Sequence, residues 1–235
     1  MTYLSRIRTA LTYGAKRLGR NLTFAGAAAL VLTGVARAET VTVVALGDSL
    51  TQGYGLPQAE GFVPQLQGWL EAQGIDAEVI NAGVSGDTTA GGLARVGWSL
   101  TPEVDAMIVA LGGNDFLRGL PPEASRANLD GILAEAAARE LPVLLVGMKA
   151  TSNYGPDYKA DFDAMYPELA AGYDTLYYES FFAGLTEAEE DLGAARAQYM
   201  QPDGIHPNAE GVEKIVAHMG PVVADLVAQA GAKSP

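Results

Sequence analysis

Residues 41–50 of the chain read Val41-Thr42-Val43-Val44-Ala45-Leu46-Gly47-Asp48-Ser49-Leu50. The apolar, β-branched run over 41–46 is typical of a buried strand, and the small residues that follow it are typical of a tight turn. Such a turn lifts the hydroxyl of Ser49 to the mouth of a sheet, where α/β proteins bind their ligands. A serine directly behind a strand also serves as the N-cap of a helix. The rest of the chain must therefore distinguish a nucleophile from a cap.

After this strand the chain alternates apolar runs with amphipathic stretches. We predict further strands over 77–81, 106–111, 143–147 and 175–178, and helices over 62–73, from about 88, and over 121–140, 157–171 and 208–230, with 187–199 helical or irregular. Strands separated by helices imply right-handed crossovers and a parallel sheet that is covered on both faces. The sequence thus predicts an α/β fold, specifically a flavodoxin-like three-layer α/β/α sandwich with a five-stranded parallel sheet.

The first 38 residues differ in composition from the remainder. They contain six of the basic residues and no acidic residue, an apolar stretch over 22–36, and the triplet Ala36-Arg37-Ala38. A basic segment, an apolar segment and an A-x-A site form a secretory signal peptide, so we expect residues 1–38 to be removed and 39–235 to form one periplasmic or secreted domain. A retained membrane anchor is the alternative, but the apolar stretch is shorter than the roughly 20 residues of a span. We therefore expect no stable membrane anchor after cleavage.

The net charge and the lack of cysteine exclude several classes of function and of site. Residues 39–235 hold 9 of the 15 basic residues and all 28 acidic residues, a net charge of −19. Such a field repels nucleic acid and anionic lipid surfaces, so we expect no nucleic-acid partner. The chain has no cysteine, which excludes thiol nucleophiles, zinc–thiolate sites and iron–sulfur clusters. With only His206 and His218, a multi-histidine metal site is not expected either.

Three further blocks carry the polar groups that acyl transfer needs. They read Asn81-Ala82-Gly83-Val84-Ser85-Gly86-Asp87-Thr88-Thr89, then Gly112-Gly113-Asn114-Asp115, and finally Asp203-Gly204-Ile205-His206-Pro207. The first two follow predicted strands, so they open on the same edge of the sheet as Ser49. The short spacing of Asp203 and His206 can place a carboxylate and an imidazole side by side on one turn. Glycine-rich loops also suggest nucleotide binding, but the G-x-G-x-x-G spacing and a P-loop lysine are both missing from the first loop.

Each of these residue types has a defined task in acyl transfer. A serine hydroxyl becomes a nucleophile when a neutral imidazole accepts its proton, which His206 can do for Ser49. Asp203 would fix the tautomer of His206 and stabilise the imidazolium. The N–H groups of Ser49 and Gly86 and the amide of Asn114 can donate to an oxyanion, and one such donor is worth about 3 kcal/mol in the barrier. A structural role in a turn or a helix cap explains each of these residues when it is taken alone. All four blocks together, in this order, favour a catalytic site.

The four blocks together resemble those of the SGNH hydrolases, also called GDSL lipases and esterases. The resemblance spans residues 41 to about 230. The stretches over 84–89 and 153–155 are most similar to the periplasmic branch of arylesterases, acyl-CoA thioesterases and lysophospholipases. The family implies a serine esterase with Ser49 as nucleophile, His206 as base and Asp203 as its partner. It also implies an oxyanion hole of Ser49, Gly86 and Asn114, and no metal or cofactor.

The substrate is indicated only by apolar residues near the expected edge of the sheet. These are Phe116, Leu117, Leu120, Met148 and Tyr154, which suit an acyl chain or an aryl group. Alternatively, Phe116 and Leu120 pack on the long helix that follows. We expect a monomer that hydrolyses a small-molecule ester through an acyl-enzyme, namely an aryl ester, a lysophospholipid or an acyl thioester. A carbohydrate O-acetyl esterase on the same fold and a non-catalytic periplasmic binding protein remain as alternatives.

Overall fold

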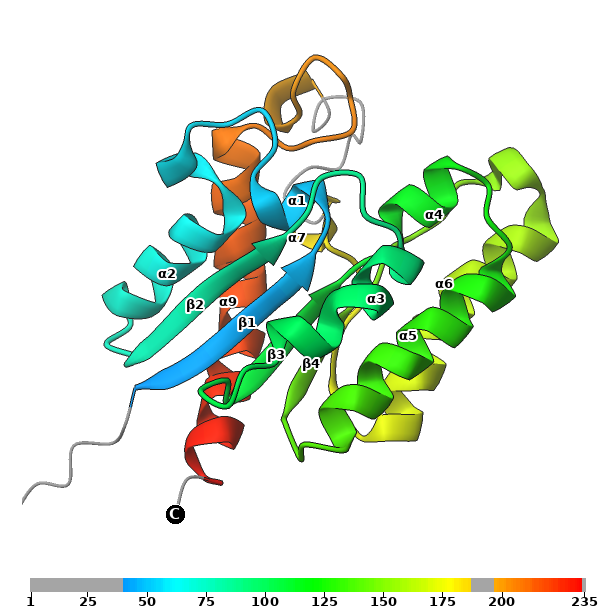
Figure 1. Ribbon diagram of the computed structural model, residues 1–235. Helices are drawn as coiled ribbons and strands as arrows, with labels where there is room; N and C mark the ends of the chain where they lie inside the picture. The colour runs from blue at the N-terminus through cyan, green and yellow to red at the C-terminus, as the bar shows by residue number, and fades with distance from the viewer. Residues whose placement is uncertain (1–39, 187–196, 234–235) are drawn as a thin grey trace, which may run out of the picture. The chain divides into compact units, whose positions relative to one another are not determined.

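The structure, a computed structural model, describes residues 40–186 and 197–233. The expected signal peptide over 1–38 and most of the segment over 187–199 lie outside the described residues. Five parallel strands form one sheet in the order β2-β1-β3-β4-β5 (Figure 1). The strands are β1 (Val41–Gly47), β2 (Ala77–Gly83), β3 (Ala106–Ala110), β4 (Val143–Val146) and β5 (Leu176–Tyr178). This confirms the predicted flavodoxin-like sandwich with a five-stranded parallel sheet.

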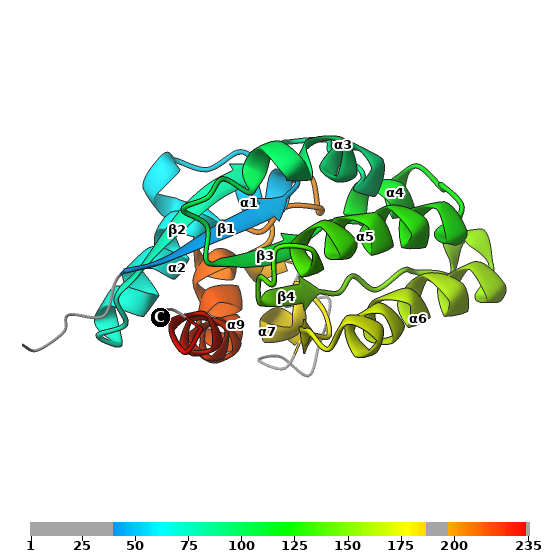
Figure 2. The same ribbon diagram turned by 60° about the horizontal axis from the view of Figure 1, so that its bottom comes forward.

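Helices cover both faces of the sheet (Figure 2). On one face α2 (Phe62–Ala72) packs against α9 (Ala209–Gly231), which also contacts α7 (Ala183–Thr186). On the other face α3 (Thr89–Ser99), α5 (Pro122–Ala137) and α6 (Pro156–Tyr173) pack side by side. Short helices α1 (Ser49–Gln52) and α4 (Gly113–Leu117) and the 3-10 turns η1 (Gln58–Glu60) and η2 (Ser152–Tyr154) complete the described elements.

The burial of each strand follows from its place in the sheet. The interior strand β1 is buried on both faces, and Val43, Ala45 and Leu46 have no exposed surface. This is why its sequence is almost continuously apolar rather than alternating. The edge strand β2 alternates instead, with Val79 buried and Ile80 exposed. The apolar core therefore lies along β1, β3 and β4 and between these strands and the helices.

Most element boundaries differ from those predicted by one or two residues, and two of the differences have a clear structural reason. Strand β2 continues to Gly83, beyond the predicted end at 81, because its pairing with β1 continues to the register Gly47↔Gly83. Helix α5 ends at Ala137 rather than near 140, because Glu140 adopts a left-handed φ of 56° that reverses the chain. In both cases the boundary is set by backbone pairing or backbone conformation at residues that lie beyond the apolar pattern.

Close approach of β2 to the turn after β1 requires a glycine. A Cβ at Gly83 would press on the backbone nitrogen of Gln52 and lie 2.9 Å from the carbonyl oxygen of Asp48. Both obstacles are backbone atoms, so they cannot rotate away. The loops after β1 and β2 are thereby held against each other at the carboxyl edge of the sheet. None of the helices within residues 40–186 and 197–233 has the length and apolar content of a membrane span.

Candidate active site

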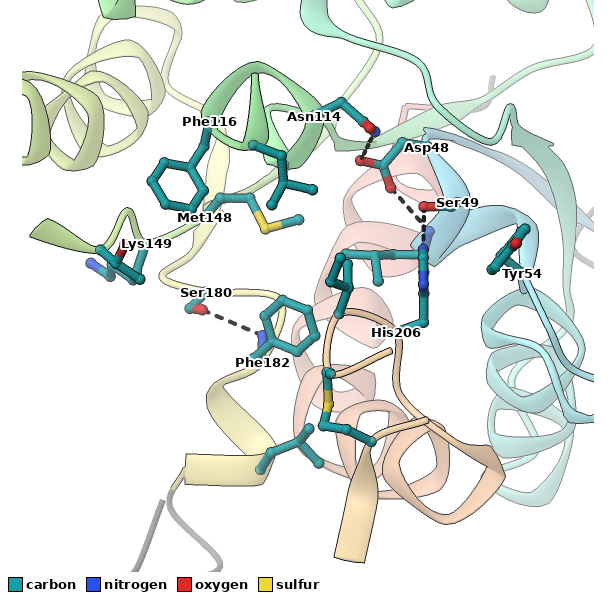
Figure 3. A pocket seen from close by; sticks show the side chains of 18 of the residues that line it. Asp48, Ser49, Tyr54, Asn114, Phe116, Met148, Lys149, Ser180, Phe182 and His206 are labelled. Carbon is teal, nitrogen blue, oxygen red and sulfur yellow. Dashed lines mark hydrogen bonds between the residues drawn. The ribbon is translucent and has the colours of Figure 1, made fainter. Parts of the chain in front are cut away.

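Ser49 is the first residue of helix α1, directly behind β1. The residue that caps this helix is Asp48, whose Oδ1 accepts a hydrogen bond of 3.0 Å from the backbone N–H of Leu50. The alternative that Ser49 serves as the cap is therefore wrong. Its hydroxyl points instead toward His206, with Ser49 Oγ 2.8 Å from His206 Nε2 (Figure 3).

The loop before α9 brings Asp203 beside His206. Asp203 Oδ2 lies 2.6 Å from His206 Nδ1, while Asp203 Oδ1 accepts the backbone N–H groups of Ile205 at 2.9 Å and His206 at 3.0 Å. An ionised carboxylate only accepts hydrogen bonds, so Nδ1 carries the ring proton of a neutral His206. The lone pair of Nε2 then faces the Ser49 hydroxyl. The predicted serine, imidazole and carboxylate thus lie in one continuous chain of hydrogen bonds.

The charge state of Asp203 is set by its partners. Partial burial by itself raises the pKa of this carboxyl group, but the hydrogen bonds from the His206 ring and from two backbone N–H groups, with the positive charge of His206, lower it to about 2. Asp203 is therefore ionised at neutral pH. An ionised Asp203 holds the His206 ring in one orientation and stabilises its protonated form.

Gly86 and Asn114 reach the same cavity as Ser49 from the ends of β2 and β3, the two strands that flank β1. Gly86 lies in the loop after β2 with a left-handed φ of 85°, and Asn114 is the second residue of α4, just after β3. All three residues line one cavity. Arg118 Nη2 donates to the carbonyl oxygen of Gly86 at 2.7 Å and so ties the Gly86 loop to the end of α4. The three groups predicted to form an oxyanion hole are brought together.

One buried side chain and one partly buried side chain fix the loops that carry these groups. Asp115, which is 1% exposed, accepts the backbone N–H of Thr89 at 2.8 Å and its hydroxyl at 2.6 Å, joining α4 to the start of α3. Arg95 on α3 donates to the carbonyl oxygens of Gly47 at 2.8 Å and Ala82 at 2.7 Å, and its Nε lies 2.6 Å from Asp87 Oδ2. Sequence reasoning missed both roles, because a charged residue within a helix ordinarily faces solvent.

The cavity in front of Ser49 has a volume of about 880 Å³ and a mostly apolar wall. Of the residues predicted to contact substrate, Phe116, Leu117 and Met148 line it. Figure 3 labels Phe116 and Met148 among the lining side chains. Sequence reasoning missed several other apolar lining residues, namely Leu50, Tyr54, Phe162, Phe182, Leu185, Met200 and Ile205. Phe182 could have been found, because it follows the predicted fifth strand at the same edge of the sheet.

Two of the residues predicted to contact substrate lie outside the cavity lining. Among the residues that the structure describes, those that line the cavity do not include Leu120 and Tyr154. The Tyr154 ring packs edge-on against Phe116, with 6.0 Å between ring centroids, and so supports the wall from behind. The carbonyl oxygen of Leu120 accepts a hydrogen bond of 2.9 Å from the hydroxyl of Tyr158 on α6. Phe116 lines the cavity, and its ring packs on η2 and α6. Its packing on α5, the long helix considered as the alternative, stays a prediction.

The acidic side chains and histidines that the structure describes form no group of three or more that could hold a metal ion. The groups gathered around the apolar cavity are a serine, an imidazole, a carboxylate and hydrogen-bond donors.

Comparison with known proteins gives consistent matches over the described fold. The model of the GDSL-like Lipase/Acylhydrolase family matches residues 45–214. The chain is 39% identical over 210 residues to Esterase TesA of Pseudomonas aeruginosa, covering 88% of this chain and 100% of the relative. It is 34% identical over 199 residues to the Thioesterase 1/protease 1/lysophospholipase L1 of Escherichia coli, covering 84% and 90%. The crystal structure of AlinE4, an SGNH-hydrolase family esterase, superposes with a TM-score of 0.63 at 44% identity, covering 80% and 96%.

Proposed function

Since the chain belongs to the GDSL-like lipase/acylhydrolase family and is a carboxylic ester hydrolase, we propose that it cleaves its substrate through an acyl-enzyme formed on Ser49. The observation that carries this proposal is the hydrogen-bonded series from Ser49 Oγ to His206 Nε2 at 2.8 Å and from His206 Nδ1 to Asp203 at 2.6 Å. Both distances are within hydrogen-bond reach, so His206 can accept the Ser49 proton while Asp203 orients the ring.

In the first step, His206 Nε2 accepts the hydroxyl proton while Ser49 Oγ attacks the ester carbonyl carbon. The carbonyl oxygen becomes an oxyanion, to which the N–H groups of Ser49 and Gly86 and the amide of Asn114 donate. The tetrahedral species collapses, and His206 protonates the departing alcohol or thiol. Water then attacks the acyl-enzyme with His206 again as base, which releases the acid and restores Ser49.

The apolar cavity supports an ester with an apolar acyl or aryl group. Phe116, Met148 and Phe182 face the space in front of Ser49, and a cavity of about 880 Å³ is large for an acetyl group alone. Relatives of this chain are named for esterase, thioesterase and lysophospholipase activity. We therefore propose aryl esters, lysophospholipids and acyl thioesters as substrates. An O-acetyl esterase of carbohydrates would need a polar, open site.

We also propose that residues 1–38 are a signal peptide, and that residues 39–235 act in the periplasm or outside the cell. The support for this is the composition of the N-terminal segment, with its six basic residues, its apolar stretch and its Ala36-Arg37-Ala38 triplet.

The decisive experiment uses nitrophenyl esters of increasing acyl length together with a serine-reactive fluorophosphonate. We expect turnover that extends beyond the acetyl ester, and covalent labelling that Ser49→Ala abolishes while the far-ultraviolet circular dichroism is unchanged. Ser152→Ala is the matched control, because Ser152 is exposed and outside the cavity. Activity confined to the acetyl ester would favour the carbohydrate esterase. A fully active Ser49→Ala variant, or a wild type that turns over no ester, would overturn the proposal.

A further inference from the structure

The mechanism above leaves one buried ionisable group beside Ser49 without a task. Asp48 precedes Ser49 and is only 2% exposed. Its Oδ1 accepts the Leu50 N–H at 3.0 Å, and its Oδ2 accepts Asn114 Nδ2 at 3.2 Å (Figure 3). Asp48 and Asn114 are 66 residues apart in the sequence. The second contact therefore joins the turn that presents Ser49 to the helix that presents Asn114.

The chemistry of the two groups fixes which way the amide lies. An ionised carboxylate only accepts hydrogen bonds, so it binds the nitrogen end of the Asn114 amide and repels the oxygen end. The amide nitrogen carries two hydrogens. One is directed to Asp48 Oδ2, which leaves the other free for an acceptor in the cavity that Asn114 and Ser49 both line.

The ionisation state of Asp48 is consistent with this orientation of the Asn114 amide. Burial raises the pKa of Asp48 to about 6, against the opposing effects of the Leu50 N–H, the Asn114 amide and the charge of His206. The carboxyl group is therefore ionised at neutral pH, as the orientation of Asn114 requires. A buried charge that destabilises the fold and lies within a site is commonly retained for function.

Helix capping does not explain the choice of aspartate. The cap uses only Oδ1, and asparagine is as good an N-cap as aspartate. What asparagine lacks is a second acceptor oxygen at the Oδ2 position. We propose that Asp48 is a positioning residue that holds the Asn114 amide with its N–H directed at the developing oxyanion. This inference rests on the proposed function.

The test is a double-mutant cycle on kcat and KM with a nitrophenyl ester. Asp48→Asn keeps the size of the side chain and the capping oxygen, but places a donor against the Asn114 donor. We expect kcat to fall about 10- to 100-fold with KM within about twofold, because an oxyanion contact forms only in the transition state. Asn114→Ala should lower kcat about 100- to 1,000-fold. The double variant should be no slower than Asn114→Ala, because Asp48 acts through Asn114.

Asp105→Asn is the matched control. Asp105 also uses a carboxylate oxygen to accept a backbone N–H, that of Thr42 at 2.8 Å, but it does so at the opposite end of β1. This control should keep its kcat. Asp48→Ser, which retains a capping oxygen but is too short to reach Asn114, provides a second route if Asp48→Asn does not fold, and its kcat should fall in the same way.

A kcat of Asp48→Asn within twofold of wild type would overturn the inference, and so would losses that multiply in the double variant. Neither result would affect the proposed function, which fails only if Ser49→Ala remains active or if wild type turns over no ester. The two failures are thus distinguishable.

Discussion

The buried carboxyl group of Asp48 couples the folding of this protein to pH. Its pKa is about 6 in the folded chain, mainly because of burial, against an ordinary value of 3.8. Below the ordinary value the group is protonated in both states and has no effect. Between the two values the unfolded chain loses the proton while the folded chain keeps it, so the free energy of unfolding falls as pH rises. Above about pH 6 the free energy of unfolding has fallen by its full amount, which is about 3 kcal/mol.

We therefore predict that Asp48→Asn gains stability relative to wild type as pH rises. The difference in unfolding free energy between the two proteins should change by about 3 kcal/mol in favour of the variant between about pH 3.5 and about pH 7.5. Urea unfolding at several pH values measures this directly. Parallel stability curves for the two proteins would contradict the prediction.

The sequence predicted which residues would meet, but not all of their contacts. Ser49, His206 and Asp203 follow from their residue types and spacing, and Gly86 and Asn114 from their places behind predicted strands. The bond between Asp48 and Asn114 could not be predicted, because it depends on side-chain directions across 66 residues of sequence. Leu120 and Tyr154, which were expected to contact substrate, do not line the cavity, since the apolar pattern of a loop does not reveal which side chains turn inward.

Helix α3 contributes to the site through Arg95, which links the carboxyl ends of β1 and β2. Its guanidinium donates to the carbonyl oxygens of Gly47 and Ala82 and pairs with Asp87, and the two charged side chains are 22% and 18% exposed. These contacts lie beneath the loops that carry Ser49 and Gly86. Removing the guanidinium leaves two carbonyl oxygens and one carboxylate without these partners.

We predict that Arg95→Met lowers the free energy of unfolding by about 3 kcal/mol and lowers kcat/KM at least about tenfold, because the two loops lose their common anchor. Thermal or urea unfolding and ester hydrolysis measure the two effects. Arg126→Met is the control, since Arg126 pairs with Glu168 on the surface and its loss should cost about 0.5 kcal/mol or less. Equal effects of the two substitutions would show that Arg95 has no special role.

Most elements could be predicted because their apolar pattern is strong. Strands β1, β3 and β4 are almost uninterrupted apolar runs, and α2 and α9 repeat apolar residues at helical spacing. Helix α4 was expected as a loop, because Gly112, Gly113 and Asn114 are all typical of turns. It forms because the left-handed φ of 117° at Gly112 starts a helical turn that Asp115 then anchors to α3.

The acidity of the whole molecule bears on the choice among ester classes. The full chain has a net charge of −13, and residues 39–235 have a net charge of −19. Such a field opposes the approach of a polyanion, and salt screens it over a Debye length of about 8 Å at physiological ionic strength. Lys149 is a basic residue in the cavity wall, but Glu179 lies in the same wall.

We predict that the KM for an acyl-CoA falls severalfold when NaCl is raised from about 10 mM to about 150 mM, because screening removes the repulsion. The KM for the matching acyl N-acetylcysteamine thioester, which has the same reacting bond and no phosphate, should change less than about twofold. Steady-state kinetics with both thioesters provide the comparison. A salt response shared by the two would contradict an electrostatic origin.

The assembled site draws on both ends of the described chain. Ser49 follows the first strand, whereas Asp203 and His206 precede the last helix and are held there by the bridge between Met200 and Pro207. A nascent chain therefore acquires its serine long before its acid–base pair. Until Asp203 and His206 have been synthesised and the loop before α9 has folded, the nucleophile lacks the base that activates it.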